Sequence, residues 1–192
     1  MPDDAGLDRG SAGALLTLPN VISFGRLCAV PLAFWLVIDH RLAAAFVLFM
    51  LAGASDAVDG WLARRSGGGN VVGAVLDPVA DKALLVTMYV TLAAVGEMPD
   101  WVAVLVVFRD MIIVGGVVVL AILGLPVTIR PLFVSKVNTL LQIVLVALTL
   151  FLSGFGIIAP SAVTAMWALS WAVAASTLAS GGAYVFKVVR VR

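Results

Sequence analysis

The feature that most restricts the fold is a succession of long apolar segments, separated by short stretches that contain glycine, proline or charged residues. Each segment approaches the length of about 20 residues that a helix needs to cross the hydrocarbon core of a bilayer. The segments lie at 21–38, 42–62, 76–95, 101–123, 133–152 and 162–186. Hydrophobic residues make up 62% of the chain, which is too high for a soluble domain. The sequence therefore predicts a polytopic membrane protein with six transmembrane helices.

The predicted fold class is all-α. The apolar segments are continuous and rich in Leu, Ala and Val, whereas a spanning β-barrel needs apolar residues that alternate with period two. No linker or repeat interrupts the segments, so we expect one six-helix domain at 17–192 after an N-terminal cytoplasmic or interfacial segment at 1–16. This first segment begins with acidic residues and lacks a basic n-region, so we expect no cleaved targeting sequence.

The distribution of charge predicts the orientation in the membrane. Basic residues follow the second and sixth segments and precede the fifth: Arg64, Arg65, Arg130, Lys187, Arg190 and Arg192. The opposite connections carry Arg41 against three acidic residues. Because cytoplasmic loops are enriched in Lys and Arg, both termini are predicted to be cytoplasmic, in an inner (cytoplasmic) membrane. The net charge of +1 gives no indication of a nucleic-acid partner.

Four aspartates interrupt the apolar sequence at Asp56, Asp59, Asp77 and Asp81. They belong to a longer pattern, D-x2-D-G-x2-A-R-x8-G-x3-D-x3-D, which runs from residue 56 to residue 81. An ionised carboxylate inside a membrane segment costs about 2.5 to 3.5 kcal/mol and is by default a functional residue. Four of them in one region therefore predict a site that contains compensating cations.

Helix geometry and the intervening turn bring these carboxylates together. Residues at i, i+3 and i+4 share a helix face, so Asp56 lies beside Asp59, and Asp77 beside Asp81. The flexible turn at 66–70 joins the two helices at their cytoplasmic ends. Two hard, oxygen-seeking ions such as Mg²⁺ or Mn²⁺ would neutralise the four like charges. Paired ions of this kind suit phosphoryl transfer, because they clamp the oxygens around phosphorus.

Small residues and one arginine accompany the aspartates. Gly60 and Gly73 leave room for a bulky ligand, and Ala63 keeps the same face shallow. Arg64, one turn after Gly60, can donate a charge-assisted pair of hydrogen bonds to a phosphate. Taken singly, such glycines are more often helix-packing residues, and such an arginine is more often a topology anchor. In fixed register with four aspartates they favour a phosphate-binding site.

The pattern at 56–81 resembles the signature of the CDP-alcohol phosphatidyltransferases, membrane enzymes that transfer a phosphatidyl group from a CDP-linked donor to an alcohol and release CMP. The resemblance implies that the four aspartates hold two divalent ions and that Asp81 is also the catalytic proton acceptor. It implies that Gly60, Arg64 and Asn70 contact the CDP-lipid, although the position of Asn70 more usually holds Ser or Thr. Members of the family are commonly homodimers, so a homodimer is expected.

Residues outside the signature narrow the resemblance. Asn20, Arg26 and Pro31, together with 76–82, resemble the branch that contains the phosphatidylglycerophosphate and cardiolipin synthases. The run at 133–142, together with Arg109-Asp110, most resembles the eukaryotic-type cardiolipin synthases. Phosphatidylglycerophosphate synthases usually carry a second lysine where this chain has Asn138. Glycerol 3-phosphate is a dianion that needs more than one cation, so the loss of a lysine favours phosphatidylglycerol, a singly charged phosphodiester.

Three polar residues have two possible roles each, and Arg26 is a further candidate for substrate binding. Asn20 fits either an N-cap of the first helix or a ligand contact, and Arg26 can supply charge to the substrate. Arg109 fits an acceptor-binding residue or a structural ion pair. Lys136 fits a ligand of the acceptor phosphate or a side chain that snorkels to the interface.

The sequence thus predicts an enzyme, a CMP-forming cardiolipin synthase that uses CDP-diacylglycerol and phosphatidylglycerol. The alternative within the class is phosphatidylglycerophosphate synthesis from glycerol 3-phosphate. The alternative from another class is a divalent-cation transporter, in which the aspartates would form an ion path. A transporter would need acidic residues along a route across the membrane, whereas these four cluster on the cytoplasmic side.

Overall fold

The computed structural model describes the backbone of residues 18–66, 71–122 and 133–190, and the side chains of 24–56, 79–116 and 133–182. The prediction of an all-α fold is confirmed for this part of the chain, which contains helices and no strand. The helices are α2 (Leu18–Ile38), α3 (Leu42–Ser66), α4 (Val71–Ala94), α5 (Asp100–Ile122), α6 (Phe133–Gly154) and α7 (Pro160–Arg190). Helices α3, α4 and α7 extend beyond the apolar segments, because hydropathy reports affinity for hydrocarbon and not the limits of helical backbone.

Two of these helices have the length and hydropathy of a membrane span. They are Phe133–Gly154 and Pro160–Gly182, and the apolar portions Phe24–Ile38 and Leu42–Asp56 are shorter than a full span. Only the described residues enter this assessment. The arrangement of six spans therefore stays a prediction, whereas the six-helix count holds in the described part of the chain.

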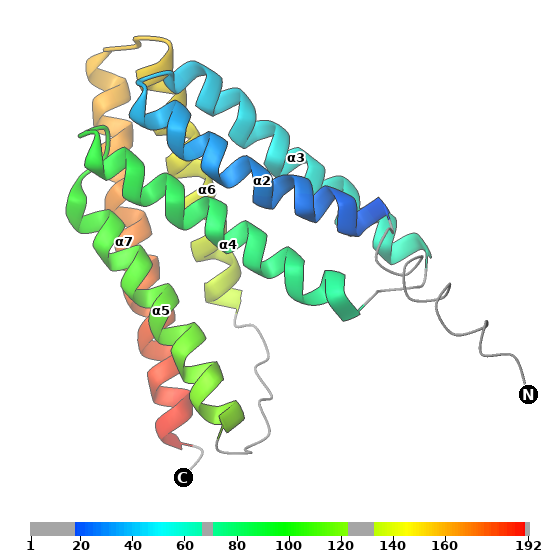
Figure 1. Ribbon diagram of the computed structural model, residues 1–192. Helices are drawn as coiled ribbons and strands as arrows, with labels where there is room; N and C mark the ends of the chain where they lie inside the picture. Colours follow the sequence, from blue (N-terminus) through cyan, green and yellow to red (C-terminus); the bar gives the residue numbers. More distant parts are fainter. Residues whose placement is uncertain (1–17, 67–70, 123–132, 191–192) are drawn as a thin grey trace, which may run out of the picture.

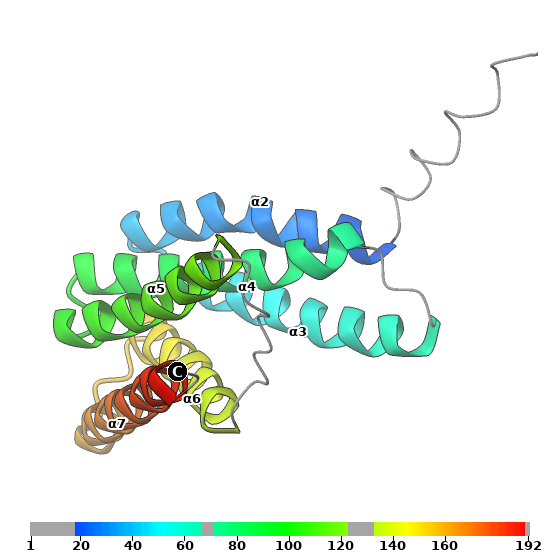
Figure 2. The same cartoon turned by 90° about the horizontal axis from the view of Figure 1, so that it is seen from below.

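The helices form a closed ring of neighbours. Helix α2 packs on α3 and α4, α4 on α5, α5 on α7, α7 on α6, and α6 on α3. Figure 1 shows that α2, α3 and α4 diverge from α5, α6 and α7 as they leave the end where the short connections lie, and Figure 2 shows the same arrangement from below. We call the end with the short connections the convergent end and the other the divergent end.

Three connections at the convergent end follow the same backbone pattern. One residue in each has a positive φ angle: His40 (54°), Gly96 (79°) or Gly156 (66°). The N–H of the next residue donates to a carbonyl five residues earlier at 2.8 or 2.9 Å, from Arg41 to Leu36, from Glu97 to Leu92 and from Ile157 to Leu152. These are Schellman-type helix endings, in which a left-handed residue satisfies the last carbonyls. They turn each helix back onto the bundle within a few residues.

Close packing joins the two halves of the ring near this end. A Cβ atom on Gly154 of α6 would lie 2.6 Å from the backbone nitrogen of Ala43 in α3, so the two helices touch at their backbones. Phe46 of α3 packs against Phe151 in a tilted geometry and against Phe155 edge to face, with ring centroids 5.5 and 6.2 Å away. Apolar residues fill the interior between them, including the fully buried Met88, Tyr89, Leu92, Leu145 and Leu150.

Candidate active site

Two of the four predicted aspartates have described side chains, and the fold brings them together. Asp56 lies on α3 and Asp81 on α4, and both side chains contact the guanidinium of Arg26 on α2. The Nη1 atom of Arg26 donates to Oδ1 of Asp56 at 2.9 Å and to Oδ1 of Asp81. The side chain of Arg26 is 2% exposed, whereas those of Asp56 and Asp81 are 47% and 45% exposed. The carboxylates therefore have a buried cation behind them and an open face in front.

The other predicted site residues of this region lie outside the described side chains. Their backbone positions are on α2 for Asn20, on α3 for Asp59, Gly60, Ala63 and Arg64, and on α4 for Gly73 and Asp77. Asn70 lies in a segment whose backbone is also outside the described residues. Within the described side chains, no group of three or more His, Cys, Asp or Glu could hold a metal ion. The structure thus places Asp56 beside Asp81, and the metal site that they are predicted to form with Asp59 and Asp77 stays a prediction.

The pairing of Arg26 differs from its predicted contact with substrate. Its guanidinium is enclosed by helices and binds two carboxylates of the predicted site. A signal for this was present in the sequence, because an arginine inside an apolar segment needs an acidic partner at the same depth. The sequence could not select that partner, since the choice depends on how α2 packs against α3 and α4.

A second polar cluster lies between α4, α5, α6 and α7. Arg109 donates to Asp110 Oδ1 at 2.6 Å, to Ser135 Oγ at 2.7 Å and to Ser180 Oγ at 2.6 Å. Lys82 forms an ion pair with the other oxygen of Asp110 at 2.5 Å. Arg109 is only 5% exposed, so the structure places it in an internal network, the structural alternative that the sequence had left open.

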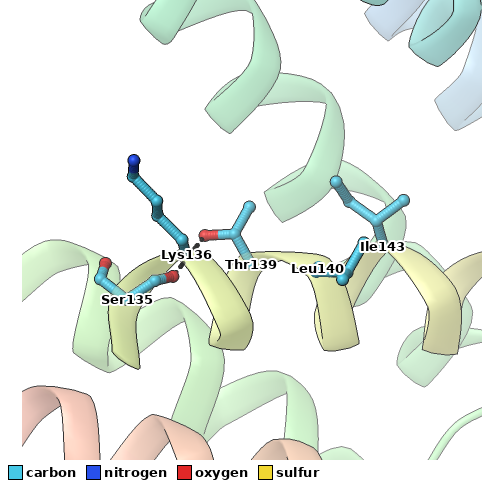
Figure 3. A pocket seen from close by; sticks show the side chains of 5 residues that line it. All are labelled: Ser135, Lys136, Thr139, Leu140 and Ile143. Carbon is cyan, nitrogen blue, oxygen red and sulfur yellow. Dashed lines mark hydrogen bonds between the residues drawn. The ribbon is translucent and has the colours of Figure 1, made fainter. Parts of the chain in front are cut away.

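Lys136 lies in a different setting, beside a groove on α6. The groove is a shallow, open hollow of about 370 Å³ on the surface of this one helix and is lined by Ser135, Lys136, Thr139, Leu140 and Ile143. Figure 3 shows Lys136 and Thr139 projecting from the same side of the helix, and the Thr139 hydroxyl donates to the Ser135 carbonyl at 3.1 Å. Lys136 is exposed, as are Leu140 and Ile143. Among the described residues, the groove therefore combines the cation of Lys136 with an apolar wall.

Asn138, two residues further along α6, does not face this groove. It is fully buried, and its Oδ1 accepts hydrogen bonds from Ser176 at 2.7 Å and Thr177 at 2.8 Å on α7. One turn later, Gln142 is also fully buried, and its side-chain atoms have no partner among the described residues. Asn138 thus ties α6 to α7. The inference that a lysine at this position would directly add charge to the acceptor site has no support from this geometry.

Comparison with known proteins places this arrangement in a family. Residues 16–178 match the family described as CDP-alcohol phosphatidyltransferase. The chain belongs to this family. The match includes Arg26, the aspartate pattern, Arg109 with Asp110, and the groove beside Lys136, and it ends within α7, two residues before Ser180.

Relatives in this family carry names of two kinds, one that refers to glycerol 3-phosphate or phosphatidylglycerophosphate and one that refers to cardiolipin. The chain is 34% identical, over 95% of its length, to a chloroplastic CDP-diacylglycerol–glycerol-3-phosphate 3-phosphatidyltransferase of Oryza sativa, of which it covers 60%. It is 31% identical over 70% of its length to the human cardiolipin synthase (CMP-forming), of which it covers 50%. It is 33% identical over 92% of its length to a probable phosphatidylglycerophosphate synthase of Mycobacterium tuberculosis, covering 83% of it.

Membership of the CDP-alcohol phosphatidyltransferases agrees with the predicted resemblance, including the likeness to CMP-forming cardiolipin synthases. The chain spans roughly a third to three fifths of the length of the first curated relatives that it matches. Because relatives with both kinds of name match the chain, similarity shows the phosphatidyltransferase family but does not select the acceptor alcohol.

Proposed function

We propose that the chain is a membrane phosphatidyltransferase that makes cardiolipin from CDP-diacylglycerol and phosphatidylglycerol, with release of CMP. The observation that carries the choice of acceptor is the groove beside Lys136, which offers a cation and an exposed apolar wall together. The family match supports the reaction class. A divalent-cation transporter, the alternative from another class, has no comparable support.

We propose that two divalent cations, Mg²⁺ or Mn²⁺, bind Asp56, Asp59, Asp77 and Asp81. The described carboxylates fit this role, because Asp56 and Asp81 lie together and are each nearly half exposed on the side away from Arg26. Carboxylate oxygens are the ligands that these hard ions prefer. When bound, the ions would neutralise the charge on the diphosphate of the donor.

The protein residues have separate roles in the proposed reaction. Asp81 accepts the proton of the acceptor hydroxyl, whose oxygen forms a bond to the phosphorus that carries diacylglycerol. The bond from that phosphorus to the oxygen of CMP breaks, and CMP leaves with the electron pair. Arg64 and Asn70 would bind the phosphates and cytidine part of the donor, and Gly60, Ala63 and Gly73 would give them room.

The charges around the groove favour a singly charged acceptor. Among the described residues, Arg109 and Lys82 are both paired with Asp110, and Arg109 is enclosed. Lys136 forms no ion pair with the residues whose side chains the structure describes, and it is exposed. One available cation matches the phosphodiester of phosphatidylglycerol, and Leu140 and Ile143 offer a surface for its acyl chains. A dianionic monoester would keep one charge without a partner.

The second candidate, phosphatidylglycerophosphate synthesis, is favoured by the relatives from Oryza sativa and Mycobacterium tuberculosis. It requires a further cation at the acceptor site. Arg130 precedes α6 in sequence and lies outside the described residues, so it is the residue that this candidate would use.

One assay separates the candidates. Purified protein in lipid nanodiscs receives labelled CDP-diacylglycerol, Mn²⁺, and either phosphatidylglycerol or glycerol 3-phosphate, and the lipid products are resolved by mass. We expect cardiolipin with the first acceptor and little product with the second. Phosphatidylglycerophosphate without cardiolipin would contradict the proposed acceptor and would leave the reaction class intact.

The Asp81→Asn variant tests the proposed base and is expected to lower turnover by at least about 100-fold. The matched control is Asp39→Asn, because Asp39 is an exposed acidic residue in the connection between α2 and α3.

We also propose that the chain is integral to the inner (cytoplasmic) membrane and works as a homodimer, with both termini and the site on the cytoplasmic side. The two span-length helices and the membrane-lipid relatives support the membrane location. The orientation rests on the distribution of Lys and Arg.

A further inference from the structure

Arg26 occupies an unusual position for a residue beside a cation-binding site. Its side chain is 2% exposed, although it lies against two carboxylates that are nearly half exposed. The guanidinium therefore reaches the carboxylates from inside the bundle. Ions that enter from the open face would approach the opposite side of the carboxylates, so nothing in this geometry requires Arg26 to leave when they bind.

The hydrogen bonds of Arg26 connect three helices. A single nitrogen, Nη1, donates to one oxygen of Asp56 on α3 and to one oxygen of Asp81 on α4. Asp56 and Asp81 are 25 positions apart in sequence, and the arginine on α2 is their common partner. A bond from one fixed nitrogen to both carboxylates also fixes the distance between them.

The guanidinium of Arg26 and the two carboxylates each need the other to be stable at this place in the fold. A guanidinium in the interior is costly unless carboxylates pair with it, and removing one partner of such a pair is strongly destabilising. Two carboxylates held close together repel each other unless a cation lies between them. In the absence of divalent ions, Arg26 is the described cation that meets both needs.

We propose that Arg26 is a built-in counter-ion and positioning residue, which holds Asp56 and Asp81 in place when divalent cations are absent and stays behind them when the cations are bound. This inference rests on the proposed metal site for its second half. Its first half, the stabilisation of the metal-free protein, concerns only contacts that the structure contains.

The test compares thermal unfolding in EDTA and in saturating Mn²⁺ for the full chain in detergent. Arg26→Met keeps the length of the side chain and removes its charge. It is expected to lower the melting temperature by about 5 °C or more in EDTA and by less than half that amount in Mn²⁺, because the ions then supply positive charge. Arg26→Lys should retain most of the stability in EDTA. Arg41→Met removes an exposed arginine paired with Asp39 and should behave alike in both conditions.

An equal loss for Arg26→Met in EDTA and in Mn²⁺ would overturn the proposal, because a residue needed only for packing is needed in both states. If this variant gives no folded protein, Arg26→Met is combined with Asp56→Asn. Removing a negative charge together with the positive one should restore folding and raise the melting temperature in EDTA. Failure of the double variant to recover would contradict the counter-ion role.

These readouts are independent of catalysis. Wild-type protein whose melting temperature does not respond to Mn²⁺ would count against the proposed metal site. The rescue of Arg26→Met by Asp56→Asn in EDTA would still decide the role of Arg26. A missing cardiolipin product would count against the proposed acceptor and would leave both unfolding experiments interpretable.

Discussion

At the scale of single residues, burial separates charged and polar groups that look alike in sequence. Arg109 and Lys136 are both basic residues in apolar surroundings, yet one is enclosed in a network and the other stands beside an open groove. Asn138 and Thr139 are adjacent, yet one faces α7 and the other faces the groove. A rotation of about 100° per residue around the helix axis produces these differences, so neighbouring positions have different functions.

The first prediction concerns Asn138→Lys. Although phosphatidylglycerophosphate synthases usually carry a lysine at this position, we expect this substitution to reduce the stability of the chain. The substitution would bury an ammonium group, and the Ser176 and Thr177 hydroxyls would lose their shared acceptor. An uncompensated buried charge is among the mechanisms that cost about 3 kcal/mol or more. We expect a melting temperature at least about 6 °C lower.

The control for this variant is Thr139→Lys, which places the same side chain on the adjacent, groove-facing position. It should leave stability nearly unchanged and improve the use of glycerol 3-phosphate, because it adds a second cation beside Lys136. Enhanced glycerol 3-phosphate use by Asn138→Lys, with normal stability, would show that our assignment of the two faces of α6 is wrong.

At the scale of helices, the closest contact is the one between α3 and α6. Gly154 lies so near Ala43 that any Cβ would come within 2.6 Å of backbone atoms. Backbone cannot move aside as a flexible side chain can, so this glycine sets the distance between the two helices. Glycine at such a crossing is a common device for close packing of membrane helices.

The second prediction concerns Gly154→Ala. We expect α3 and α6 to separate and the melting temperature to fall by about 4 to 8 °C, an effect of about 2 kcal/mol. Gly53→Ala is the matched control, since a Cβ there would have no neighbour within 4 Å. It should be neutral or slightly stabilising, because alanine favours helix. Similar melting temperatures for the two variants would contradict the close approach.

At the scale of the whole molecule, hydropathy predicted where the helices lie along the chain, but it could not predict which side chains of different helices contact each other. The six apolar segments correspond to α2–α7, with ends that shift by several residues where polar residues continue a helix. The aspartate spacing predicted one cluster of four carboxylates, because that cluster depends on two neighbouring helices and one turn. The described Asp56 and Asp81 share Arg26, and the places of the other two stay a prediction. The partners of Arg26, Arg109 and Asn138 could not be predicted, since each depends on contacts between helices that are distant in sequence.

The third prediction concerns Asp110, which connects the ring of helices. Asp110→Asn removes the charge that Lys82 on α4 and Arg109 on α5 share, while Arg109 also binds α6 and α7. The buried Arg109 would then lack its carboxylate, at a cost of about 3 to 5 kcal/mol. We expect a drop in melting temperature of about 6 to 20 °C, with weaker binding of α4 to α5 seen as faster proteolysis.

Asp100→Asn is the control, because Asp100 is an exposed acidic residue at the start of the same helix. Its melting temperature should stay within about 2 °C of the wild-type value. A stable Asp110→Asn variant would mean that the serine hydroxyls alone satisfy Arg109.

The contact between Gly154 and Ala43 also limits how the two halves of the ring can move relative to each other. It lies at the convergent end, where α6 ends and α3 begins. Lys136 is in the first turn of α6 and Asp81 is in the N-terminal half of α4, so both lie toward the divergent end, one in each half of the ring. Lys136 is separated from Gly154 by about 27 Å of helix, so a rotation of about 2° at the contact moves Lys136 by about 1 Å. A displacement of about 1 Å between reacting groups can slow a reaction by about 100-fold. The helix crossing is therefore the pivot about which a small rotation of one half of the ring would change the distance between Asp81 and Lys136.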